Sequence, residues 1–259
     1  PDGDALGSSL GLMHFLRQFR HNVHVITPNS YADFLHWMPG NEDVIVYEDN
    51  EEEAKQITEN ADLIFLLDFS HICRIADFAD TVNNSNATKI LIDHHQDPDM
   101  EIADIIFSDT TASSTAQLLY EVIDSMDLTN YINKEIAECL YVGIMTDTGS
   151  FKYSSTTTKT HQIIAELIAI GAENAKIHDL IYDNSSANSM KLLGYCLNKK
   201  LLLYPENNSA VISLTAEELK RFNFKKGEQY FVCLSNENTE GYVIADAIQV
   251  IGLTSPIEN

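Results

Sequence analysis

The first 110 residues alternate short apolar runs with segments of helical periodicity, and this alternation most limits the folds open to the chain. The apolar runs predict five strands, at residues 22–27, 43–48, 63–69, 89–93 and 104–108. The segments between them predict helices at residues 8–19, 51–60 and 72–82. Several of the runs are apolar throughout, which is typical of strands covered on both faces. The pattern therefore predicts an α/β fold with a doubly wound, mainly parallel sheet.

Helices dominate the next part of the chain, and the pattern changes again after residue 200. Helices are predicted at residues 114–126, 134–147, 158–171 and 187–199, followed by a hairpin around 205–209, a short helix at 215–222 and strands at 229–234 and 241–250. We therefore predict a first domain over residues 1–185 and a helical connector over 186–200. Residues 201–259 form a smaller α/β part that is too short to close on its own.

The composition excludes some classes of partner. The formal net charge is −23, and long duplex nucleic acid needs a positive surface. The sequence has no run of about 18 apolar residues, so it predicts no membrane span. The four cysteines are far apart and predict free thiols of a cytoplasmic protein rather than disulfides or a zinc site; they are Cys73, Cys139, Cys196 and Cys233. Small anions stay compatible with this surface if metal ions neutralise the site locally.

Side chains that bind metals or protons fall at the ends of several predicted elements. They are Asp2 and Asp4 before the first helix, Asp68 after the third strand, Asp93, His94 and His95 after the fourth strand, and Asp147 at the end of a helix. The carboxyl ends of parallel strands open into one crevice at the edge of the sheet. The sequence therefore predicts that these side chains converge there.

A cluster of carboxylates needs a counter-charge, because mutual repulsion otherwise raises the pKa of some of its members. Divalent cations supply that charge, and a mixed set of carboxylate and imidazole ligands suits Mn²⁺, with Mg²⁺ as the alternative. Two ions bridged by one aspartate can activate a water for attack on a phosphoryl group. The pattern thus favours a hydrolase that acts on phosphoester bonds.

Four segments carry a resemblance to a known family. They read PDGDALGSS (1–9), LLDFS (66–70), LIDHH (91–95) and GIMTDTGSFKYSST (143–156). In this order the sequence resembles the DHH phosphoesterases, named for the triplet at 93–95, and is most similar to their bacterial nanoRNase branch. That resemblance implies hydrolysis of very short oligoribonucleotides, of 3′-phosphoadenosine 5′-phosphate, or of both.

The resemblance also implies a role for each metal ligand. Asp2 would bind the first metal ion, and Asp4 the second. Asp68 would bridge the two ions. His94 and Asp147 would complete the second site. In the family a further metal-binding histidine stands three residues before the position of Pro1, so we expect the chain to continue beyond its first residue.

The catalytic assignments follow from the same resemblance. His95 would face the phosphate as a general acid or an electrostatic stabiliser, and Asp93 would orient an imidazole ring. Asp68 also belongs to the predicted catalytic set, because it would bridge the two metal ions. Residues 1–185 would form the catalytic domain and 201–259 part of a substrate-binding domain. That domain in the family carries a glycine-rich GGGH segment, so we also expect continuation beyond Asn259.

Two other functions stay open at this point. A family II inorganic pyrophosphatase shares the N-terminal motifs, although it needs a basic C-terminal lobe, which the sequence scarcely offers. A nucleotide-binding module that retains the acids without turnover is the second alternative. Short oligonucleotides or small phosphorylated nucleotides are the predicted ligands, and the sequence leaves a homodimer open.

Overall fold

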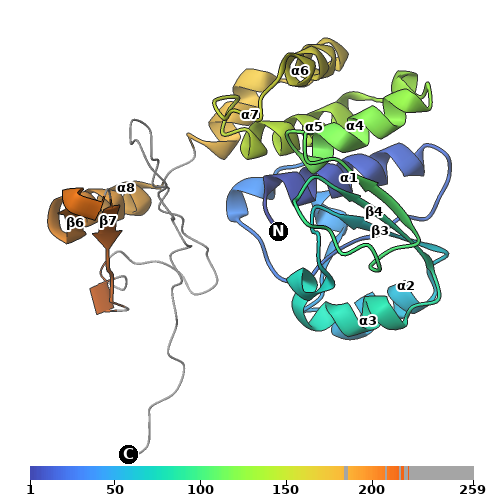
Figure 1. The fold of residues 1–259 in the computed structure, drawn as a ribbon, viewed down its shortest axis with the longest axis horizontal. Coiled ribbons are helices and arrows are strands. Elements are labelled where there is room, and N and C mark those ends of the chain that lie inside the picture. Colours follow the sequence, from blue (N-terminus) through green and yellow to red (C-terminus); the bar gives the residue numbers. More distant parts are fainter. Residues whose placement is uncertain (184–185, 208, 216, 219–220, 222–259) are drawn as a thin grey trace, which may run out of the picture. The chain divides into compact units, whose positions relative to one another are not determined.

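The computed structural model describes residues 1–183, 186–207, 209–215, 217–218 and 221. The chain divides into two compact units between Ile181 and Tyr182. The first unit has α/β architecture with parallel sheets, as predicted (Figure 1). The sequence-based boundaries at residues 185 and 200 stay a prediction.

Parallel strands form the centre of the first unit. The strands are β1 (Val25–Thr27), β2 (Val44–Val46), β3 (Leu63–Leu67), β4 (Thr88–Asp93) and β5 (Ile105–Ser108). The α-helices are α1 (Gly3–Arg17), α2 (Glu51–Glu59), α3 (Ala79–Asn84), α4 (Thr115–Ser125), α5 (Lys134–Asp147), α6 (Thr158–Ile170) and α7 (Asn174–Ile181). Short 3₁₀ segments are η1 (Asp33–Leu35), η2 (Asn41–Asp43), η3 (Ile72–Phe78) and η4 (Thr129–Tyr131). Strand β1 pairs with β2, and a second sheet has the order β3-β4-β5.

Both faces of the second sheet are covered, which makes the unit doubly wound. Successive side chains of a strand point to opposite faces. Leu66 and Leu91 pack in a core cluster with the side chains of α2 and α3. Their neighbours Leu67 and Ile92 pack in the other cluster, with α1, α4 and α5. Figure 1 shows these two groups of helices on opposite sides of β3 and β4.

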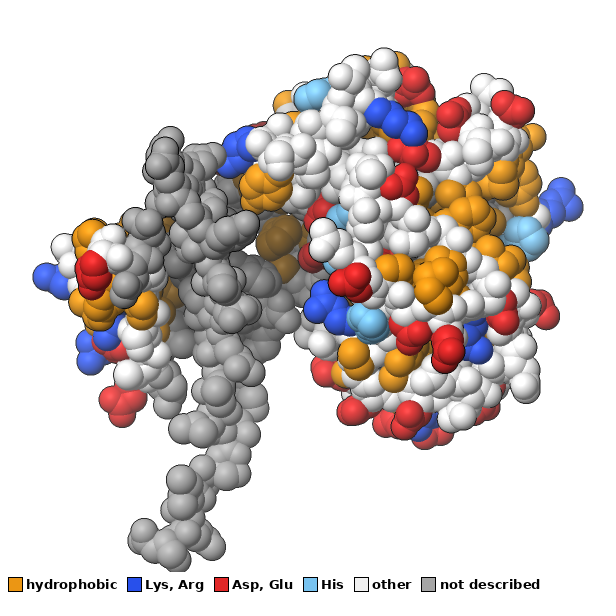
Figure 2. All heavy atoms as spheres, viewed as in Figure 1, with side chains coloured by type: hydrophobic (Ala, Val, Ile, Leu, Met, Phe, Trp, Pro, Cys, Tyr) orange, Lys and Arg blue, Asp and Glu red, His pale blue; other side chains and the backbone are white. Residues whose placement is uncertain are grey.

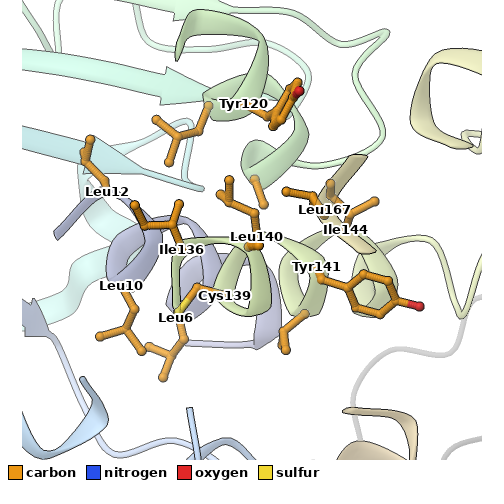
Figure 3. Packing of buried hydrophobic residues seen from close by; sticks show 14 of the residues in the cluster. Leu6, Leu10, Leu12, Tyr120, Ile136, Cys139, Leu140, Tyr141, Ile144 and Leu167 are labelled. Atoms are coloured by element: carbon orange, nitrogen blue, oxygen red, sulfur yellow. The ribbon is translucent and has the colours of Figure 1, made fainter. Parts of the chain in front are cut away.

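Helices α1 and α5 lie very close together, and glycines permit this approach. A Cβ atom placed on Gly7 of α1 would lie 2.6 Å from the carbonyl oxygen of Cys139 and 2.8 Å from the backbone nitrogen of Gly143, both on α5. Around this contact Leu6 and Leu140 interdigitate in the core that Figure 3 shows. The packing fixes the start of α1 beside the end of α5, where Asp4 and Asp147 lie.

Two sequence predictions within this unit were wrong in detail, and one helix was missed. The first helix runs over Gly3–Arg17 instead of 8–19, because the Asp2 carboxylate caps it and accepts hydrogen bonds from the backbone N–H groups of Asp4 and Ala5. The helix predicted at 72–82 divides into η3 and α3, because Ala76 has a non-helical φ of 49°. Helix α7 was not predicted.

The described residues of the second unit include a helix and a hairpin. Its elements are α8 (Ala187–Tyr195), the π-helical segment η5 (Cys196–Lys200), β6 (Leu201–Tyr204), the 3₁₀ segment η6 (Pro205–Asn207) and β7 (Ser209–Ile212). Strands β6 and β7 pair antiparallel, which confirms the predicted hairpin. The strands predicted at 229–234 and 241–250 lie outside the described residues.

Two predictions from composition can be compared with the structure. Among the described residues the cysteines are free thiols, namely Cys73, Cys139 and Cys196, and Cys233 lies outside them. No helix within the described ranges is long and apolar enough to cross a membrane.

Candidate metal centre

Asp4 is held at the floor of the centre by the first turn of another helix. Its side chain is buried, with 1% of its surface exposed. The backbone N–H of Thr115 donates to Asp4 Oδ2 at 2.6 Å, and that of Ala116 donates to Oδ1 at 2.9 Å. Both donors belong to the start of α4, where helical N–H groups lack partners within the helix and favour negative charge. Helix α4 therefore fixes both oxygens of this carboxylate.

Asp68 follows the last residue of β3 and lies beside Asp4. Its backbone adopts a left-handed conformation with φ of 66°, which turns the chain sharply where the strand ends. The hydroxyl of Thr115 donates to Asp68 Oδ1 at 3.0 Å. Thr115 is fully buried, so this single residue holds Asp4 through its backbone and Asp68 through its side chain.

The two histidines reach this pair from the end of β4. His94 Nε2 lies 3.9 Å from Asp4 Oδ2, 3.7 Å from Asp68 Oδ1 and 3.3 Å from Asp147 Oδ2. His95 Nδ1 lies 2.7 Å from Asp93 Oδ1 and 3.8 Å from Asp68 Oδ1.

These ligand atoms form two overlapping groups of the size that can hold a metal ion. One contains Asp68, His94 and His95, and the other contains Asp4, His94 and Asp147. The members come from the start of α1, the ends of β3 and β4 and the end of α5. The structure thus brings together side chains that lie more than 140 positions apart in the sequence.

Asp2 stands apart from both groups of described ligand atoms. Its Oδ1 accepts hydrogen bonds of 3.0 Å from the backbone of Asp4 and of Ala5, so it caps α1. Its charge still acts on Asp4 and Asp68 and raises the pKa of each. Its role as a metal ligand, like the roles assigned to the other six residues, stays a prediction.

Without metal ions, burial and mutual repulsion disfavour the ionised form of the carboxyl groups in this centre. Burial, and after it the charge of Asp147, raises the pKa of Asp4 to about 7. Burial, and after it the charge of Asp4, also raises the pKa of Asp68 far above its usual range. Burial raises the pKa of Asp147 as well. Carboxyl groups that resist ionisation in this way are stabilised by a nearby cation.

The donor set fits a divalent metal ion. Its oxygen and imidazole nitrogen donors suit Mn²⁺ and similar ions better than metals that prefer sulfur. Asp93 is fully buried, and its Oδ2 has no hydrogen-bond partner among the described residues. That orphaned oxygen beside the two histidines indicates that the centre is made for a further polar or charged group.

Comparison with known proteins identifies the family. A profile described as "DHH family, N-terminal domain" matches residues 1–144. The chain belongs to the DHH family. It is 30% identical over 232 residues to the bifunctional oligoribonuclease and PAP phosphatase NrnA of Bacillus subtilis (strain 168), covering 88% of this chain and 68% of that protein.

A solved structure shares the fold. The crystal structure of an exopolyphosphatase-related protein from Bacteroides fragilis matches with a TM-score of 0.84 and 43% sequence identity, over 88% of this chain and 66% of that one. This chain therefore spans about two thirds of the length of the two relatives.

Sequence reasoning missed the residues that support the carboxylates. Thr115 and Ala116 hold Asp4 from α4, and Gly143 leaves the room, since a Cβ atom there would lie 2.8 Å from Asp4 Oδ1. The helix predicted at residues 114–126 is present as α4, and Ser114 caps its start by accepting a hydrogen bond from the backbone N–H of Gln117. Nothing in the sequence of this helix indicated which carboxylate its first N–H groups would bind.

Proposed function

We propose that this chain hydrolyses phosphoester bonds in oligoribonucleotides a few nucleotides long and removes a phosphate from 3′-phosphoadenosine 5′-phosphate. The convergence of three carboxylates, those of Asp4, Asp68 and Asp147, within 3.3–3.9 Å of the His94 ring nitrogen carries this proposal. The similarity to a bifunctional oligoribonuclease and PAP phosphatase supports the choice of substrates.

Two divalent ions, Mn²⁺ or Mg²⁺, complete the proposed centre. Asp2, Asp4, Asp68, His94 and Asp147 would hold them, with Asp68 shared between the two. When bound, such ions lower the pKa of a coordinated water and neutralise charge on a phosphoryl group. The bonds from Thr115 and Ala116 keep Asp4 oriented before any ion arrives, which reduces the ordering cost of binding.

His95 is the residue proposed to act on the substrate itself. Asp93 occupies its Nδ1 at 2.7 Å, which leaves Nε2 as the nitrogen for a substrate oxygen. The hydrogen bond that His95 Nδ1 donates to Asp93 raises the pKa of His95, so the protonated ring persists to higher pH than that of an ordinary histidine. A protonated His95 can donate to a phosphoryl oxygen or pass a proton to the departing oxygen.

The charge of the chain is the reason for proposing short substrates. With 39 acidic and 16 basic residues, the chain has a net charge of −23. Figure 2 shows acidic side chains spread over the visible face of the first unit, many of them along the edge that α2 and α3 form. A long polyanion would be repelled along such a surface, whereas a substrate of a few nucleotides would extend little beyond the proposed metal ions.

The test is hydrolysis of a ribodinucleotide, 3′-phosphoadenosine 5′-phosphate and pyrophosphate, each with Mn²⁺ and with a chelator. We expect turnover of the first two with Mn²⁺ only. Asp68→Asn should reduce it by more than about 100-fold. Asp62→Asn is the matched control, because Asp62 precedes the same strand at its other end and is exposed.

The outcomes separate the three functions. Equal activity on long single-stranded DNA would contradict the proposed preference for short substrates. Turnover of pyrophosphate alone would indicate an inorganic pyrophosphatase. Nucleotide binding without hydrolysis, with Mn²⁺ demonstrably bound, would indicate a binding module.

A further inference from the structure

A buried glutamine connects two helices next to the metal centre. Gln117 is the third residue of α4 and directly follows Thr115 and Ala116, whose backbone N–H groups bind Asp4. Only 2% of its surface is exposed. A buried amide needs hydrogen-bond partners for both its oxygen and its nitrogen. The partners of this side chain therefore show which parts of the fold it joins.

The oxygen of the amide accepts hydrogen bonds from two buried hydroxyl groups. Ser113 Oγ donates to Gln117 Oε1 at 2.6 Å, and Thr160 Oγ1 donates to the same atom at 2.9 Å. Ser113 precedes α4, whereas Thr160 lies in the first turn of α6. Thr160 is fixed in turn, because its hydroxyl oxygen accepts a hydrogen bond from the backbone N–H of Thr157, the cap of α6. The amide oxygen thus joins the starts of the two helices.

The nitrogen of the amide leads to an ion pair between the same two helices. Gln117 Nε2 donates to Glu121 Oε1 at 2.9 Å, one turn farther along α4. The other carboxylate oxygen of Glu121 lies 2.6 Å from Lys159 Nζ, in the first turn of α6. The position therefore needs an acceptor on one side and a donor on the other, which an amide supplies and a carboxylate or an apolar side chain does not.

The first turn of α4 is the part of that helix that supports the metal centre. The backbone N–H groups of Thr115 and Ala116 donate to Asp4, and the Thr115 hydroxyl donates to Asp68. These three donors hold the carboxylates in one orientation only as long as the turn itself stays in place. The side chain of Gln117 ties this turn to α6.

The connection also reaches the other side of the metal centre. The segment 148–157 runs from Asp147, the last residue of α5, to Thr157 at the start of α6. Gln117 therefore contacts the helix at the far end of this segment as well as the turn that binds Asp4.

We propose that Gln117 is a positioning residue of the metal centre. It holds the first turn of α4 in the orientation in which Thr115 and Ala116 bind Asp4, and it touches neither a metal ion nor the substrate. This inference rests on the metal centre of the proposed function and adds to it a residue that lies outside the ligand set.

Gln117→Leu tests the proposal, because leucine fills much of the same space without hydrogen bonds. In the metal-free protein, with chelator, the amide hydrogens of Thr115 and Ala116 should exchange with solvent at least about tenfold faster than in the wild type. In calorimetry the dissociation constant of Mn²⁺ should rise by about tenfold, as for other residues that orient metal ligands. A higher Mn²⁺ concentration should restore kcat, since Gln117 takes no part in the chemical step.

Tyr120→Phe is the matched control. The hydroxyl of Tyr120 donates to Glu166 on α6, so it joins the same two helices at a point farther along α4 from the metal centre. Its loss should lower the Tm to a similar extent but leave Mn²⁺ binding and the exchange of the two amides little changed. If both variants weaken Mn²⁺ binding equally, or if Gln117→Leu changes neither Mn²⁺ binding nor amide exchange, the assignment of Gln117 is wrong.

Thr160→Val gives a second and milder variant, because it removes the partner on α6 and keeps the glutamine. It should weaken Mn²⁺ binding by part of the same factor, and the double variant with Gln117→Leu should bind about as weakly as Gln117→Leu alone, since both changes break one bond. Independent, additive effects would contradict the proposal. If Gln117→Leu does not fold, Thr160→Val takes its place in the comparison with Tyr120→Phe.

The proposed function and this inference can fail separately. Normal Mn²⁺ binding without hydrolysis of any substrate would contradict the proposed function. The amide exchange measured in chelator tests the role of Gln117 with neither metal nor substrate present.

Discussion

Replacement of Gly143 by alanine would test how closely three helices meet beneath the metal centre. An ideal Cβ atom at this position lies 2.5 Å from the Cβ atom of Ala116 on α4 and 2.8 Å from Asp4 Oδ1 on α1. Carbon atoms in contact normally lie about 3.5–4.0 Å apart. The added methyl group therefore has to displace the start of α4, which is the segment that donates both hydrogen bonds to Asp4.

The expected loss of stability follows from two opposing terms. Overpacking of a tight core costs about 1–3 kcal/mol. Alanine in a helix is favoured over glycine by about 0.8–1 kcal/mol. The free energy of unfolding of the first unit should therefore fall by up to about 2 kcal/mol. Binding of Mn²⁺ should weaken by about tenfold or more, because Asp4 loses its fixed orientation.

Urea unfolding followed by tryptophan fluorescence is a suitable assay. The chain has one tryptophan, Trp37, and this residue packs against the core of the first unit, so the signal reports that unit. Isothermal titration with Mn²⁺ measures the second effect.

Gly11→Ala is the control within the same helix pair. A Cβ atom there meets the Leu140 side chain, at 3.0 Å from Cδ2 and 3.3 Å from Cγ, and this flexible group can shift. Its stability should stay within about 1 kcal/mol of the wild type, with unchanged Mn²⁺ binding. If Gly143→Ala behaves like Gly11→Ala in both measurements, the close approach of α1, α4 and α5 is refuted.

Three further predictions concern the carboxylates themselves. Thr115→Val removes the hydroxyl that donates to Asp68 and should weaken Mn²⁺ binding by about tenfold in calorimetry, whereas Thr115→Ser should restore it. The unfolded chain releases the Asp4 proton near pH 4, whereas the folded metal-free chain keeps it to about pH 7 because of burial. The stability of the metal-free protein should therefore fall between these pH values, and the Tm of Asp4→Asn relative to wild type, in chelator, should be higher at pH 8 than at pH 5. Asp93→Asn weakens the hydrogen bond that raises the pKa of His95, so the NMR titration midpoint of that ring should move to lower pH; an unchanged midpoint would contradict the assigned contact.

Much of the fold follows from local signals that survive in the final structure. Helix α5 begins and ends at the predicted residues, Lys134 and Asp147, because Asn133 caps its start and Gly149 adopts a left-handed φ of 55° beyond its end. The parallel strands were found because they are apolar on both faces. Helix α7 was missed because its eight residues have only Ile177 and Ile181 buried, too few for a clear periodic pattern.

The sequence predicted those parts of the candidate site that side-chain type and position at the ends of elements reveal. The rule that strand ends converge at one sheet edge brought Asp68 and His94 together correctly. Every residue except proline has a backbone N–H group, so the hydrogen bonds from Thr115 and Ala116 to Asp4 could not be predicted from the sequence. The unoccupied Cβ position of Gly143 is likewise visible only when three helices are placed against one another.

The supporting contacts explain how the fold tolerates a cluster that repels itself. Asp4 and Asp68 are buried close together, and burial raises the pKa of both, so the ionised pair destabilises the metal-free chain. The backbone donors of α4 and the hydroxyl of Thr115 offset part of that cost without adding a positive charge. A lysine in their place would neutralise the acids and remove their affinity for cations. Neutral donors instead orient the carboxylates and leave the charge uncompensated, which is the arrangement expected of a site prepared for divalent metal ions.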